Sequence, residues 1–82
     1  MMRAFGYAKK RISDGGLLEM GEVTFAGSSS TIREIARFLT AAADEIEKRQ
    51  GRFDHAHIGD VCEGWQDEWP DIIVARSSQP ED

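Results

Sequence analysis

Hydrophobic and polar residues alternate along the start of the chain, then change to a helical period near residue 29. From Arg3 to Ile12 the aromatic residues fall on one side of an extended chain and small residues on the other, which predicts a strand. The segment Ser13–Gly16 contains an Asp-Gly pair, which suits a tight turn. A second run of strand-forming residues spans Leu17 to Ala26. The first 26 residues therefore predict a β-hairpin.

The second predicted strand changes phase in its middle. Leu18 and Met20 share one face, whereas Val23 and Phe25 fall on the opposite face if the pairing is regular. A bulge at Gly21 inserts one residue and returns all four side chains to the same face. The alternatives are a sheet that is buried on both faces and a strand that starts late.

The strongest periodic signal predicts a helix from Ser29 to Gln50. Its N-cap is one of the Ser and Thr residues before the apolar stripe: Thr31 with Glu34 has capping-box spacing, and Ser28 also qualifies. Gly51 suits the C′ position. The stripe expected to face the core comprises Ile32, Ile35, Ala36, Leu39, Ala42, Ala43 and Ile46, with Phe38 at its margin.

The pattern is less regular after Phe53. We expect a loop with one helical turn around Ile58, followed by a buried strand over Ile72–Ala75 and a frayed tail from Ser77 to Asp82. The predicted architecture is one α+β domain over residues 1–76. A hairpin, a long helix and a last strand (ββαβ) form a small antiparallel or mixed sheet with the helix on one face.

Charge is distributed unevenly along the 82 residues, whose net charge is −5. Eight acidic residues lie between Asp54 and the C-terminus, against a single basic residue, Arg76. Nucleic-acid binding is disfavoured because phosphate contacts need clustered Lys and Arg. The sequence shows no run of about 20 apolar residues that spans a membrane. The lone Cys62 has no partner for an internal disulfide, which fits a reducing compartment, so we expect a cytoplasmic protein. The acidic charge favours a basic protein as its partner.

Candidate chemistry is concentrated between His55 and Cys62. His55, His57, Asp60 and Cys62 are metal-ligand types, but no CxxC or HxxxH element accompanies them. Cys62 and a histidine could form a nucleophile pair, but no third orienting group can be named for them. Paired carboxylates could serve a hydrolase, but acidic residues that are spread through an irregular segment are typical of solvated surface. We therefore expect no catalytic residues, no metal and no cofactor, with the histidines and the cysteine in packing roles.

Two tryptophans within the acidic segment favour partner binding instead. Trp is enriched both in small cores and at interface hot spots, so the two roles are divided between Trp65 and Trp69. The residues predicted to bind a partner are Asp60, Glu63, Trp65, Asp67, Glu68, Trp69 and Asp71.

The segment from Leu17 to Arg76 resembles the immunity protein 32 family of bacterial polymorphic toxin systems. The resemblance is carried by LLEMGEVTF, the Ser-led helix with IARFL, the FDHAH segment and the closing WPDIIV, in that order and spacing. It implies an α+β protein that binds and neutralises a cognate toxin, often a nuclease, and it implies no catalytic residues. The alternative is a structural or regulatory homodimer without a toxin partner, in which the acidic segment keeps the protein in solution.

Overall fold

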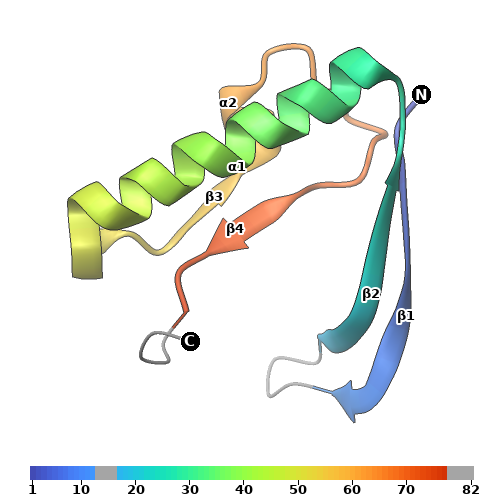
Figure 1. Cartoon of the computed structure of the whole chain (residues 1–82), viewed down its shortest axis with the longest axis horizontal. Coiled ribbons are helices and arrows are strands. Elements are labelled where there is room, and N and C mark those ends of the chain that lie inside the picture. Colours follow the sequence, from blue (N-terminus) through green and yellow to red (C-terminus); the bar gives the residue numbers. More distant parts are fainter. Residues whose placement is uncertain (13–16, 78–82) are drawn as a thin grey trace.

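A computed structural model describes residues 1–12 and 17–77 of the chain (Figure 1). The elements are β1 (Arg3–Ile12), β2 (Leu18–Ala26), α1 (Ser29–Arg49), a 3-10 turn (Gln50–Arg52), β3 (His55–His57), α2 (Ile58–Val61) and β4 (Ile73–Ala75). The predicted α+β class is confirmed, and the order is roughly the predicted ββαβ, with β3 and α2 added between α1 and the last strand. The predicted turn at Ser13–Gly16 and the predicted tail beyond Ser77 lie outside the described residues.

The hairpin has the bulge that the phase change predicts. Tyr7 pairs with Glu22 but Ala8 pairs with Met20, so Gly21 is the extra residue. Partners that face each other across an antiparallel pair share a face. Val23, opposite Gly6, therefore lies on the same face as Met20, as predicted.

Helix α1 begins and ends at polar caps. The Ser28 hydroxyl accepts a hydrogen bond from the Thr31 amide at 3.2 Å, so Ser28 is the N-cap and the Thr31–Glu34 capping box is not formed. At the other end Gln50 is the C-cap, so Gly51 occupies the predicted C′ position, but the glycine does not carry the positive φ. Gln50 takes the positive φ, 52°, and its amide bonds the carbonyl of Ile46. Gly51 instead lies inside the 3-10 turn, which prolongs the helix towards Phe53.

The buried side of α1 is rotated from the stripe that periodicity predicts. Phe38, expected at the margin, is buried together with Ile35 and Ala42. Ile32 and Leu39, expected in the core, are 39% and 43% exposed. The apolar part of the helix is therefore wider than the core that covers it, and one of its sides is open.

The segment after the helix contains a strand that the sequence did not reveal. The three residues of β3 pair antiparallel with β4, and the expected helical turn at Ile58 is α2. The Ile58 amide also bonds the Ile72 carbonyl at 2.9 Å, which ties α2 to the approach to β4. The alternating His-Ala-His segment is too short and too polar to stand out as a strand.

The core lies between α1 and the β3–α2–β4 segment. Met2, Ile35, Phe38 and Ile58 form its buried centre, with Trp65, Trp69 and four smaller apolar residues packed against it. The prediction of one small sheet is wrong: among the described residues the strands form two separate pairs, β1–β2 and β3–β4. The hairpin therefore extends from the body as an arm (Figure 1).

The dimensions of the molecule reflect this open shape. Its radius of gyration is 13.8 Å, whereas a compact domain of this length has about 11.7 Å. Within the described part of the chain, no helix combines the length and the apolar character needed to cross a bilayer.

Candidate partner-binding surface

The loop between α2 and β4 carries most of the residues predicted to bind a partner. Two turns shape it: the Trp65 amide bonds the Cys62 carbonyl at 3.1 Å, and the Trp69 amide bonds the Gln66 carbonyl at 3.0 Å. These local bonds fold the loop back on itself, so that both tryptophans point to the same region. Pro70 then leads the chain towards β4.

The two tryptophans pack against each other and against the core. Their ring centroids are 5.0 Å apart and the rings are nearly perpendicular, at 87°, which is a favourable edge-to-face geometry. Trp65 Nε1 donates a hydrogen bond to the Pro70 carbonyl at 3.0 Å. Both side chains are half-buried and contact the buried cluster. Neither one projects as an isolated anchor; together they form a rigid, partly exposed apolar platform.

The five predicted acidic residues are all exposed, but they point to three different places. Asp60, Asp67 and Asp71 line one shallow depression of about 480 Å³. Glu63 lies on the other side of the loop, where it borders a groove against α1. Glu68 lies beside the first residues of the chain. The structure therefore brings three of the carboxylates together and separates the other two from them.

A histidine joins the three-carboxylate depression. His57 Nδ1 lies 2.6 Å from Asp71 Oδ2, and an ionised carboxylate only accepts, so the ring nitrogen donates. His55 is paired in the same way with the neighbouring Asp54, also at 2.6 Å. The two imidazole rings meet edge to face with centroids 5.0 Å apart. Each histidine thus holds a carboxylate in place, and the His57–Asp71 bond connects β3 to the approach to β4.

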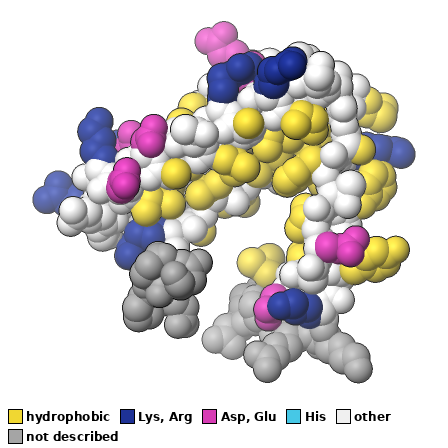
Figure 2. Space-filling view, in the orientation of Figure 1, with side chains coloured by type: hydrophobic (Ala, Val, Ile, Leu, Met, Phe, Trp, Pro, Cys, Tyr) yellow, Lys and Arg dark blue, Asp and Glu magenta, His cyan; other side chains and the backbone are white. Residues whose placement is uncertain are grey.

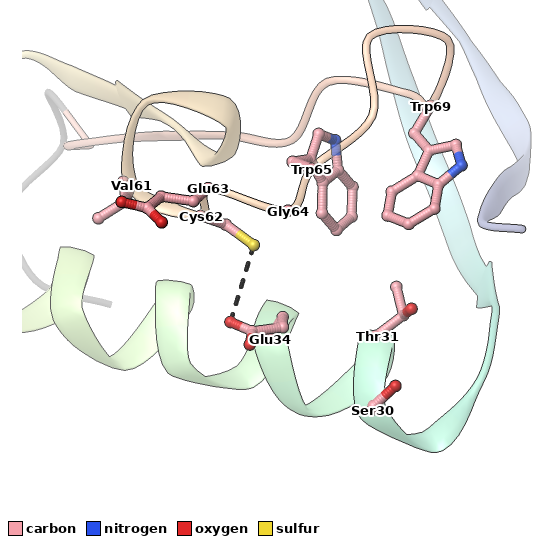
Figure 3. A pocket seen from close by; sticks show the side chains of 9 residues that line it. All are labelled: Ser30, Thr31, Glu34, Val61, Cys62, Glu63, Gly64, Trp65 and Trp69. Carbon is pink, nitrogen blue, oxygen red and sulfur yellow. Dashed lines mark hydrogen bonds between the residues drawn. The ribbon is translucent and has the colours of Figure 1, made fainter.

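The groove beyond Glu63 separates the loop from the first turns of α1 (Figure 3). It measures about 390 Å³. Glu34 is the charged group on its helical side: it accepts a hydrogen bond from Arg37 at 2.7 Å and one from the Cys62 thiol at 3.7 Å. The bond from Arg37 lowers the pKa of Glu34 below its usual value, against a smaller opposing effect of desolvation. The carboxylate is therefore ionised and anchored towards the helix and Cys62.

The histidine and cysteine side chains of this region are all held by carboxylates. Within residues 1–12 and 17–77, no three side chains of His, Cys, Asp or Glu are placed to hold one metal ion. The Cys62 thiol is directed to a carboxylate, and each histidine Nδ1 is engaged by an aspartate. Glu34 was missed as a groove residue because its sequence context suggested a helix cap. Its spacing of three from Arg37 was the available signal.

No family model, curated protein or solved structure matches this chain.

Proposed function

We propose that the chain is an immunity protein that binds and neutralises a cognate bacterial toxin in the cytoplasm, and that the toxin is a nuclease with a basic cleft. The observation that carries this proposal is the convergence of Asp60, Asp67 and Asp71 on one open depression beside the tryptophan platform. The resemblance of the motif order and spacing to the immunity protein 32 family also motivates it.

Electrostatics gives this surface a physical role. A nuclease presents positive charge to phosphates, and carboxylates that line one depression act together on such a surface. Each exposed carboxylate contributes little alone. As a group the carboxylates raise the association rate and occupy the positions of substrate phosphates. Glu63 and Glu68, on neighbouring faces of the loop, extend the same negative field.

The tryptophan pair supplies the apolar part of the contact. Its rings are held by the core and by the Trp65–Pro70 hydrogen bond, so little side-chain entropy is lost when a partner covers them. The His57–Asp71 pair similarly orients one of the three carboxylates before binding. In this proposal the surface is preorganised, and binding requires no movement of the loop.

The test combines charge reversal with a salt titration. The variant Asp60→Lys with Asp67→Lys is compared with Asp44→Lys with Glu47→Lys, which changes the net charge equally on exposed positions of α1. The probe is the nuclease domain of a toxin whose gene adjoins that of this chain. Association rates are measured by stopped flow over a range of salt concentrations, and protection is measured as growth on co-expression.

We expect the loop variant to lose roughly tenfold or more in association rate at low salt, to lose most of its salt dependence and to stop protecting cells. The helix variant should retain both binding and protection. Equal losses of association rate in the two variants would mean that net charge, and not the position of the loop carboxylates, determines binding. Unchanged binding by a folded loop variant would refute the acidic surface as the toxin site.

A further inference from the structure

We propose that the hairpin arm, β1 with β2, docks onto α1 of a second copy of this chain and that the protein is a two-fold dimer. The proposal rests on two complementary apolar surfaces within one chain that do not cover each other. It does not depend on the acidic loop or on the toxin.

One face of the arm is almost wholly apolar. The pairing register places Ala4 opposite Phe25, Gly6 opposite Val23 and Ala8 opposite Met20, so these six residues share a face. We call this set the arm face. Val23 is 54% exposed, and Met20 and Phe25 are also exposed.

Gly6 keeps the arm face flat. A Cβ at this position would lie 2.6 Å from the Glu22 carbonyl oxygen, and the end of the Met20 side chain occupies the space directly above it. Met20 therefore lies across the neighbouring strand and fills the gap that the glycine leaves. A flat apolar ribbon of this kind is suited to packing against a helix.

The second surface is the open side of α1. Ile32, Ala36, Leu39 and Ala43 follow one another at steps of four, three and four residues, so they form one line along the helix, and all four are exposed. We call them the helix stripe. The buried residues Ile35, Phe38 and Ala42 lie next to this line and already contact the body. The helix stripe is thus the half of the apolar helix surface that this chain leaves uncovered.

Both surfaces remain exposed within one chain. Met2, which precedes Ala4 by two residues, has its side chain in the core, so strand alternation turns the arm face towards the body. Figure 2 shows the hollow between the arm and the body, with hydrophobic side chains along the helix above it and on the arm beside it. Two such molecules related by a two-fold axis can each place an arm against the helix stripe of the other.

The surface area leaves room for a partner. The chain exposes 6793 Å², whereas a folded monomer of 9.2 kDa exposes about 4,900 Å². The excess, roughly 1,900 Å², is more than the ~800 Å² that each partner contributes to a standard interface. A two-stranded hairpin with water on both faces is also marginally stable at best, so the arm needs a surface to pack on.

The charge pattern favours a second copy over a basic toxin as the occupant. In sequence, the arm contains the consecutive basic residues Lys9, Lys10 and Arg11, of which Lys9 pairs with Glu19 at 3.4 Å, and this composition does not suit a basic protein as the occupant. The segment from Phe53 to Arg76 carries six acidic residues and one basic residue. The arm and the 53–76 segment therefore carry opposite charge, so two copies attract each other where a basic toxin and the arm do not.

Sedimentation equilibrium at micromolar concentration tests the dimer. We expect the mass of two copies, against 9.2 kDa for one. Val23→Lys on the arm face and Leu39→Lys on the helix stripe should each weaken association by at least roughly tenfold, because each buries a charge at the centre of an apolar contact. Val61→Lys, at an exposed apolar position of α2 outside both surfaces, is the matched control and should leave the dimer intact.

A crosslinking experiment distinguishes exchange from an arm that folds back on its own helix. Both cysteines are introduced in a Cys62→Ser background, either as Met20→Cys and Ala36→Cys on separate chains or as both changes on one chain. Exchange predicts a disulfide between chains in the mixed sample and a two-chain product from the doubly substituted chain. A disulfide within a single chain, a monomer, or a dimer that neither lysine variant weakens would each overturn the proposal.

Discussion

The burial of Ile58 makes it the most sensitive test of the core described above. Its side chain is 0% exposed and packs in the small cluster with Met2, Ile35 and Phe38. Ile58→Val removes one methylene, whose transfer to water alone is worth about 0.8 kcal/mol. With the cavity it leaves, the expected loss in free energy of unfolding is about 1 kcal/mol.

That loss is large for a chain of this size. A single small core gives roughly 3–5 kcal/mol, so Ile58→Val removes about a fifth to a third of the stability. Ile58→Ala, at about 3 kcal/mol, should leave the protein close to unfolded. With a urea m-value of about 1 kcal/mol/M, the midpoint for the valine variant should fall by about 1 M.

The assay is urea unfolding followed by the fluorescence of Trp65 and Trp69, at one fixed protein concentration because association adds to apparent stability. Val61→Ala is the control: it removes two methyls from the same short helix, at a position that is 58% exposed. Its expected change stays within about 0.5 kcal/mol. A midpoint shift for Ile58→Val no larger than that of Val61→Ala would refute the position of the core.

Three further outcomes follow from local geometry. Arg37→Gln should raise the pKa of Glu34 towards its ordinary value, which NMR titration of the Glu34 carboxyl measures. Because the pKa of Glu34 is lowered in the folded state, the Glu34–Arg37 pair stabilises the fold at pH values above the unfolded-state pKa. This stabilisation is lost as the pH falls through the folded-state pKa. Ser28→Ala removes the acceptor for the Thr31 amide and should lower the free energy of unfolding by about 1 kcal/mol, measured by thermal or urea unfolding. An unchanged free energy of unfolding would mean that Ser28 is not the N-cap. Gln50→Gly relieves a φ of 52° and should stabilise the fold by roughly 1 kcal/mol, whereas a loss of stability would mean that the glutamine side chain itself is needed.

Features that depend on neighbouring residues were predictable from the sequence. The phase change around Gly21 predicted the bulge that the register contains, and the limits of β1 and α1 followed from alternation and from the 3.6-residue period. The N-cap was reduced to a few Ser and Thr residues, but their side chains have nearly equal capping ability, so the sequence did not select Ser28. In the acidic segment the residue types predicted a binding surface, a prediction that the toxin experiment will test.

Features that depend on distant residues were not predictable. The apolar residues of α1 cover more than one side, and the β3–α2–β4 segment determines that Phe38 is buried while Leu39 is open. The convergence of Asp60, Asp67 and Asp71 likewise requires the two turns of the loop and the pairing of β3 with β4. The three residues of β3 are too few for a period to be recognised, whereas β4 was predicted because its residues belong to a β-branched run.

Local patterns along the chain determined that the protein has a hairpin, a long capped helix and an acidic tryptophan-containing loop, because hydrogen bonding and side-chain direction within each element repeat over a few residues. Tertiary structure alone decided that the hairpin is an arm and does not join β3 and β4 in one sheet, that the tryptophans form a platform on the core, and that a line of apolar helix residues remains exposed. These outcomes depend on which apolar surfaces pack against each other. Because the hydrophobic effect is not directional, the sequence of one element does not specify the surface that it packs on.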